Sequence, residues 1–112
     1  LQGDRPDAAD PAFDDWGIPT AESLVAVRAV VEGLPLIASG GIRSGIEMAK
    51  AIALGASYAG MALPLVGPAA KSSGAVKDKI RQIIQEFKIA MFSCGARNLE
   101  ELKKGQHIRK LP

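Results

Sequence analysis

The residues best suited to chemistry are Gly40, Gly41 and Arg43, which stand between a short apolar segment and the start of a helix. Glycines let the backbone turn sharply and come close to a ligand. The first N–H groups of a helix point outward at the positive end of its dipole, and this arrangement binds anions. Arg43 adds a cation that can grip a phosphate with two hydrogen bonds. This order of residues predicts a phosphate site. The alternative is a plain strand-to-helix turn with a surface arginine.

The helix after this turn is expected to begin at Ser44, because Ser44 and Glu47 have the spacing of a capping box. Gly55 is a suitable stop for it. Its packed side should carry Ile46, Ala49 and Ala53.

The hydrophobic pattern of the rest of the chain alternates between helices and strands. Thr20 is a good N-cap for a helix over residues 20–32, with Gly33 as the stop. Strands are predicted at 36–39 and 56–61, a long helix at 73–94 closed by Gly95, and a short turn capped by Asn98 and Glu101. The alternation predicts an α/β fold with parallel strands.

Residues 63–68 are expected to form a loop after the second strand, because their two prolines supply no hydrogen-bond donor to a sheet. This loop and the diglycine turn should lie at the same end of neighbouring strands. The long helix should pack through one apolar stripe. The stripe consists of Val76, Ile80, Ile83, Ile84, Phe87 and Met91.

Two strands alone would leave open edges and a bare helix-packing surface. The chain is therefore expected to be the C-terminal part of a (β/α)₈ barrel, whose phosphate site is commonly built by its last two strand-to-helix loops. In this interpretation residues 20–112 form the barrel segment, residues 1–19 form a loop or mobile linker, and an N-terminal part is missing.

Composition limits the remaining possibilities. The 112 residues are 47% hydrophobic but only 4% aromatic, and no apolar run approaches the roughly 20 residues of a membrane span. No leader is evident, and the single cysteine, Cys94, allows no internal disulfide, so a cytoplasmic location is expected. Residues 35–112 hold twelve basic and five acidic residues. Aromatic residues are not interleaved with them, so nucleic-acid binding is not expected.

Several segments resemble one family. Residues 39–45 (SGGIRSG), 49–56 (AKAIALGA) and 60–64 (GMALP) are similar to the closing third of FMN-dependent (β/α)₈ enzymes. Residues 16–20 (WGIPT), the alanine at position 38 and the pattern of residues 90–102 narrow the resemblance to type II isopentenyl-diphosphate isomerases.

The resemblance implies a flavin site and a reaction. Gly41, Ile42 and Arg43 match the first FMN-phosphate segment, and Ala62 and Leu63 match the second. The implied reaction converts isopentenyl diphosphate to dimethylallyl diphosphate with reduced FMN, NADPH and Mg²⁺, in a homo-oligomer. No segment matches the family's catalytic or metal-binding residues, so none is assigned.

Other residues have weaker claims. Trp16 could cover the active site or pin its loop to the barrel wall. His107 has no ligand or catalytic partner at a suitable spacing, and Cys94 is expected to be a structural thiol. Two alternatives to the isomerase stay open: an FMN-dependent oxidoreductase such as a 2-hydroxy acid oxidase, and a non-catalytic phosphate-binding fragment.

Overall fold

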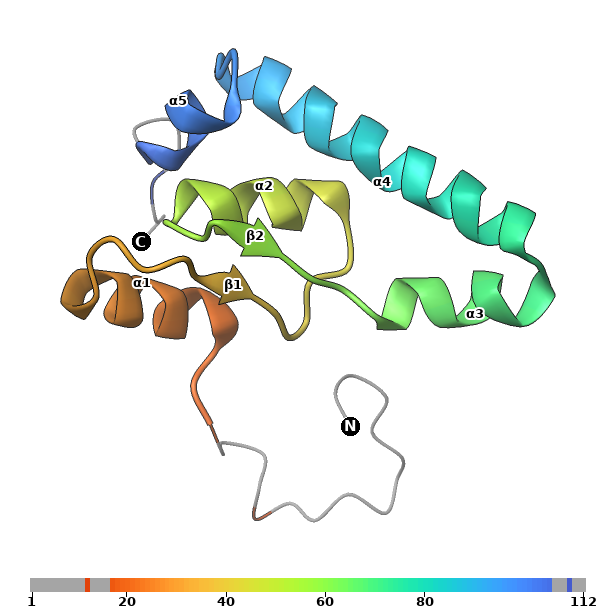
Figure 1. Ribbon diagram of the computed structural model, residues 1–112, viewed down its shortest axis with the longest axis horizontal. Helices are drawn as coiled ribbons and strands as arrows, with labels where there is room; N and C mark the ends of the chain where they lie inside the picture. Colours follow the sequence, from red (N-terminus) through yellow and green to blue (C-terminus); the bar gives the residue numbers. More distant parts are fainter. Residues whose placement is uncertain (1–11, 13–16, 106–108, 110–112) are drawn as a thin grey trace.

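The computed structural model describes residues 12, 17–105 and 109, in which helices alternate with short strands (Figure 1). In chain order the elements are α1 (Thr20–Val30), β1 (Ile37–Ala38), α2 (Gly45–Ala53), β2 (Tyr58–Ala59), α3 (Leu63–Lys71), α4 (Ser73–Cys94) and α5 (Leu99–Lys103). The strands pair in parallel, with Ile37 opposite Tyr58 and Ala38 opposite Ala59. This pairing confirms the predicted α/β arrangement.

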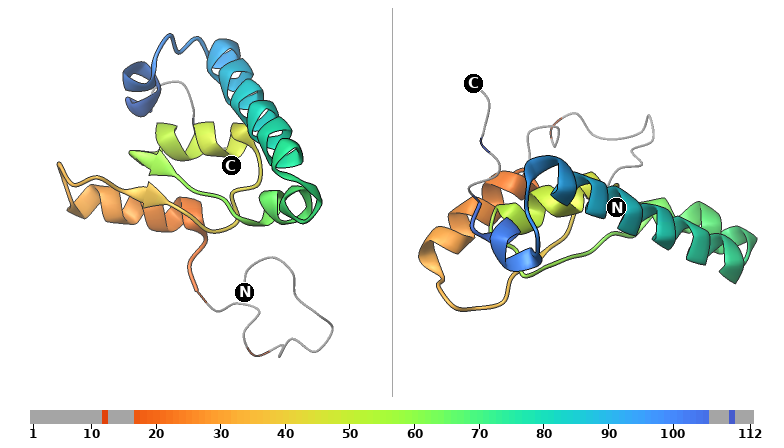
Figure 2. Two further views of the ribbon diagram at one scale, coloured as in Figure 1. Left: turned by 45° about the vertical axis from the view of Figure 1, so that its right-hand side comes forward. Right: turned by 90° about the horizontal axis from the view of Figure 1, so that it is seen from above.

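α2 is the central helix of the fold and packs against β2, α4 and α5. α2 connects the two strands and lies between them and α4, as both figures show (Figures 1 and 2). The core that they enclose is made mostly of alanines, which allow helices and strands to approach closely. It contains Leu24, Ala38, Ile42, Ala49, Ala51, Ile52, Ala53, Ala56, Ala96 and Leu102.

Local capping chemistry sets the ends of the last two helices. α4 has the predicted bounds, begins after the Ser72 hydroxyl, which accepts the Ala75 N–H at 3.0 Å, and ends at Gly95 with φ 82°. The Asn98 side chain accepts the Glu101 N–H at 2.9 Å, which confirms the predicted cap of α5. Lys103 is the last residue of α5.

The prediction of a loop at residues 63–68 was wrong, because these residues begin α3. Pro64 stands in the first turn, where its missing N–H would have no partner in any case. Pro68 lies inside the helix and removes one internal hydrogen bond. The helix tolerates this loss where it stands, since none of its residues is buried.

Four further expectations need correction. Ile46, predicted on the packed side of its helix, is 49% exposed. α1 ends at Val30 instead of Glu32, and Thr20 is its first residue instead of its N-cap. The strands are two residues long, shorter than predicted. Among the stripe residues of α4 only Ile83 is buried, and Ile80 and Ile84 stay exposed because α2 covers one side of α4.

Among the described residues, helices cover one face of the sheet and leave the other face exposed. Ile37 and Tyr58 share a face because they are register partners, and their side chains are 70% and 64% exposed. Ala38 and Ala59 alternate to the other face, where Ala38 is 3% exposed. The ladder to β2 uses the backbone groups of Leu36 and Ala38, and no described segment pairs with the outer edge of β1.

Candidate functional site

The two predicted phosphate segments follow the carboxyl ends of paired strands. The N–H of Gly60 donates to the carbonyl of Ala38 at 2.8 Å, so the strands remain joined up to the start of both loops. The first loop runs from Ser39 into α2, and the second runs from Met61 into α3 (Figure 1). The structure thus places the two segments at one end of the sheet, as predicted.

The first loop has the backbone shape that its glycines predict. Gly40 and Gly41 have φ angles of 102° and 74°, in the left-handed region that favours glycine. A side-chain carbon built on Gly41 would meet nothing within 4 Å, so the backbone is open on that side. The Ile42 side chain is buried in the core and anchors the loop from below.

Several backbone N–H groups at this end of the sheet have no hydrogen-bond partner within the described residues, and four of them lie in the two predicted phosphate segments. These four belong to Gly41, Ile42, Ala62 and Leu63. Leu63 is the first residue of α3, so its free N–H also lies at the positive end of a helix dipole. The donor set fits an anion that accepts several hydrogen bonds, such as a phosphate.

Arg43 contributes differently from expectation. Its backbone N–H donates to Glu47 Oε1 at 2.8 Å, and so is already paired. Its exposed guanidinium makes no hydrogen bond or ion pair with any residue that the structure describes, and it is available to a ligand. Arg43 is therefore a side-chain candidate for the phosphate site.

The predicted capping box is present in altered form. The Ser44 hydroxyl accepts the Glu47 N–H at 3.1 Å, which sets the start of α2. The Glu47 carboxylate reaches back one residue further than the usual box, to Arg43. Both bonds hold the loop that connects Gly41 to the helix.

A second carboxylate also caps α2, and the sequence pattern did not reveal it. Glu86 Oε1 on α4 accepts the Gly45 N–H at 2.9 Å, and Gln82 Nε2 donates to Glu86 Oε2 at 3.3 Å. These bonds, with the Gly45 N–H as the main cause, hold the pKa of Glu86 below its ordinary value. Only the three-dimensional packing of α4 on α2 brings these residues together.

Gly45 is needed at this point for close packing. A side-chain carbon on Gly45 would collide with the backbone of Ile83 and Phe87 on α4. The start of α2 therefore lies directly against the backbone of α4. This contact fixes the end of the loop that carries Gly41.

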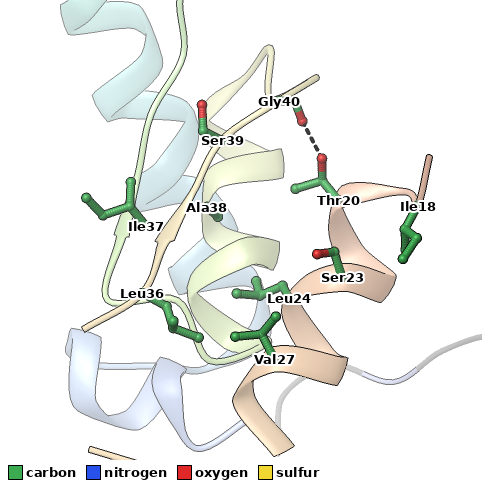
Figure 3. Close-up of a pocket in the computed structure, with 10 residues that line it drawn as sticks. All are labelled: Ile18, Thr20, Ser23, Leu24, Val27, Leu36, Ile37, Ala38, Ser39 and Gly40. Carbon is green, nitrogen blue, oxygen red and sulfur yellow. Dashed lines mark hydrogen bonds between the residues drawn. The ribbon is translucent and has the colours of Figure 1, made fainter. Parts of the chain in front are cut away.

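Two long-range contacts of α1 were also missed from the sequence. The Thr20 hydroxyl donates to the Gly40 carbonyl at 2.7 Å (Figure 3). Arg28 donates to the Gly55 carbonyl from Nε and Nη2, and to the carbonyls of Val31 and Leu34 from Nη1. A cavity of about 330 Å³ lies between α1 and β1, beside the Thr20 contact.

The remaining candidates add no chemistry to this site. Cys94 is half-buried and its Sγ lies 3.5 Å from the Met91 carbonyl, in keeping with a structural thiol. Trp16 and His107 lie outside the described residues. Within the described part of the chain, no group of three or more potential ligands could hold a metal ion. No helix there has the length and apolarity to cross a membrane.

Comparison with known proteins identifies the class. The chain belongs to the FMN-dependent dehydrogenase family, whose model matches residues 14–110. Because the family is FMN-dependent, this match supports FMN as the cofactor.

Curated relatives are named isopentenyl-diphosphate delta-isomerase, which confirms the predicted resemblance. The relative from Nostoc sp. is 46% identical over 88% of this chain and 28% of its own length. Those from Thermococcus kodakarensis and Pyrococcus furiosus are 55% and 56% identical over 82% of this chain, and 25% and 23% of their own lengths. The chain thus spans about a quarter of the relatives it matches.

Proposed function

We propose that this chain is the C-terminal part of a (β/α)₈ barrel that binds FMN and converts isopentenyl diphosphate to dimethylallyl diphosphate. In this proposal Gly41, Ile42, Ala62 and Leu63 bind the FMN phosphate through backbone N–H groups, and Arg43 binds it through its side chain. One observation carries the proposal: unpaired donors from two loops gather at the carboxyl end of two paired parallel strands. The names of the relatives suggest the reaction.

The open surfaces of the sheet support the barrel. Within the described residues β1 pairs with β2 alone, so the backbone groups of Ile37 and Ser39 on its outer edge would pair with a further parallel strand. Ile37 and Tyr58 expose large apolar surfaces on the face opposite the helices. In a closed barrel this face points inward and is filled by side chains from other strands.

The chain's own residues would bind and orient the cofactor. The four N–H groups hold a phosphate without a charged side chain, and the Arg43 guanidinium neutralises part of its charge. When bound, reduced FMN supplies the group that transfers protons to and from the substrate. NADPH as the reductant and Mg²⁺ at the substrate diphosphate belong to the proposal, with their ligands elsewhere in the complete protein.

The subunit arrangement and location are further parts of the proposal. The exposed Ile80 and Ile84 side chains on α4 are available to pack against the rest of the barrel or against a second subunit. We propose a cytoplasmic homo-oligomer. Size-exclusion chromatography with light scattering on the complete protein tests the oligomer.

The function is tested on the complete protein that contains this chain. The purified protein is expected to show a flavin absorption spectrum and to form dimethylallyl diphosphate from isopentenyl diphosphate when FMN is reduced with NADPH. Flavin reduction by a 2-hydroxy acid without isomer formation would instead favour the oxidoreductase that the family name describes. Absence of both flavin binding and turnover would favour a non-catalytic fragment.

A further inference from the structure

The contact between Thr20 and Gly40 joins the first residue of α1 to the turn after β1. The Thr20 hydroxyl donates to the Gly40 carbonyl oxygen at 2.7 Å, and both residues are half-buried. α1 has no side-chain cap, so the Thr20 hydroxyl serves the turn and not its own helix. Figure 3 shows the bond at the edge of the cavity between α1 and β1.

This bond acts on the next N–H along the chain. The Gly40 carbonyl and the Gly41 N–H belong to one planar peptide unit and point in opposite directions when that unit is trans. Glycine on both sides lets such a unit rotate between orientations at little steric cost. By holding the carbonyl toward α1, Thr20 directs the Gly41 N–H away from α1.

We propose that Thr20 is a positioning residue that fixes the Gly41 N–H in the orientation required to bind the phosphate of FMN. The inference rests on the proposed function, because it needs a phosphate at Gly41. Thr20 itself would make no contact with the cofactor. Its contribution is preorganisation: the turn has its ligand-binding shape before the ligand arrives.

The test compares FMN with riboflavin, which is the same flavin without the phosphate. Both dissociation constants are measured by flavin fluorescence on the complete apoprotein. Thr20→Val removes the hydroxyl and keeps the shape of the side chain. We expect it to weaken FMN binding about tenfold, the effect of about 1.4 kcal/mol, and to leave riboflavin binding unchanged. Thr20→Ser retains a donor and is expected to restore FMN binding.

Ser23 provides a matched control. It lies one turn further along α1, lines the same cavity, and its hydroxyl makes no hydrogen bond with the described residues (Figure 3). Ser23→Ala is expected to change neither dissociation constant. If Thr20→Val does not fold, as judged by circular dichroism, Thr20→Ala replaces it in the same comparison.

The outcomes separate the inference from the function on which it rests. A wild-type protein that binds riboflavin as tightly as FMN would overturn both. A wild-type preference for FMN that persists in Thr20→Val would overturn only the positioning role. Equal weakening of both flavins in Thr20→Val would also overturn it, because a purely structural role does not depend on the phosphate.

Discussion

Glu86 on α4 accepts the backbone N–H of Gly45 at 2.9 Å, across 41 residues of sequence. The bond is formed where α2 begins and where Gly45 lies against the backbone of α4. The carboxylate is also placed at the positive end of the α2 dipole, which favours its charged form. One end of the proposed phosphate loop is therefore held by a helix that follows it in the chain.

We predict that this contact makes stability depend on acidic pH. The Gly45 N–H lowers the pKa of Glu86 in the folded protein. A lowered folded-state pKa gives a contribution that is complete above the ordinary value of 4.5 and is lost as the pH falls through the folded value. Urea unfolding of the complete protein should show Glu86→Gln to be destabilised above pH 4.5, with the difference from wild type shrinking below it.

Glu32 supplies the control for this prediction. Its side chain is exposed, and it forms no hydrogen bond with the described residues. Glu32→Gln should differ from wild type by an amount that does not change with pH. If the difference in unfolding free energy between Glu86→Gln and wild type were also independent of pH, the proposed role of Glu86 would be contradicted.

A side chain at position 45 should be disruptive for a steric reason. Gly45→Ala would push a methyl group into the backbone of Ile83 and Phe87 on α4. We expect it to lower the free energy of unfolding by about 1–3 kcal/mol, as overpacking typically does. Chemical denaturation of the complete protein measures the change.

The matched control is Gly67 on α3, whose added carbon would meet nothing within 4 Å. Gly67→Ala should change the free energy of unfolding by less than about 1 kcal/mol, because the lower backbone entropy of alanine is opposed by the extended preference of a residue before proline, here Pro68. Equal effects at positions 45 and 67 would argue against the close contact between α2 and α4.

The Arg28 contacts predict a stabilising role for a residue with no evident chemistry. Its guanidinium spans the carbonyls of Gly55, Val31 and Leu34, with the shortest distance 2.7 Å, from Nη2 to Gly55. A lysine ammonium is a point donor that cannot reach all three. We expect Arg28→Lys to cost about 1–3 kcal/mol of unfolding free energy.

Arg81 is the comparison for Arg28. Its only ion pair is with Asp78 in the described region, and its side chain is 74% exposed. Arg81→Lys should change the unfolding free energy by less than about 0.5 kcal/mol. A similar loss at both positions would show that the carbonyl contacts of Arg28 contribute little.

The sequence predicted features that depend on near neighbours and missed those that depend on packing. The bounds of α4, the Ser44 cap and the Asn98 cap follow from residues within four positions of each other. The bonds of Thr20 to Gly40 and of Arg28 to Gly55 join residues 20 and 27 positions apart. The local pattern of amino-acid types does not reveal such pairs, because they form only when α1 packs beside β1.

The parts of the site that depend on neighbouring residues could also be predicted from the sequence. Glycines at positions 40 and 41 follow a short apolar segment, so their place after β1 could be predicted. The use of the Arg43 N–H by Glu47 could not, because the usual capping box would direct that carboxylate to the N-cap residue itself. The start of α3 was not predicted because proline breaks a strand, but proline is also favoured in the first turn of a helix, where Pro64 lies.

The Arg43 side chain gives the most direct test of the phosphate site. Its guanidinium is exposed and unpaired within the described structure, and it stands beside the free N–H groups of Gly41 and Ile42 in the sequence. Loss of a charge-assisted hydrogen bond typically costs about 1.5–3 kcal/mol. We therefore expect Arg43→Gln to weaken FMN binding by roughly tenfold to a hundredfold, with riboflavin binding unchanged. The affinity of Arg43→Lys for FMN should lie between those of wild type and Arg43→Gln. A lysine keeps the charge, but its ammonium does not form the paired bonds of a guanidinium.

Two further measurements test the role of Arg43: the dependence of FMN binding on ionic strength, and a control substitution at a distant arginine. The difference between wild type and Arg43→Gln should shrink as ionic strength rises, because salt screens an exposed charge. Arg97→Gln makes the same charge change at a side chain that is 86% exposed and paired with Glu101 on α5. If Arg97→Gln weakened FMN binding as much as Arg43→Gln, the effect would reflect net charge alone, and Arg43 would have no specific place beside the phosphate. A loss confined to Arg43 and to FMN would instead require a guanidinium within reach of that phosphate, since riboflavin differs from FMN only there.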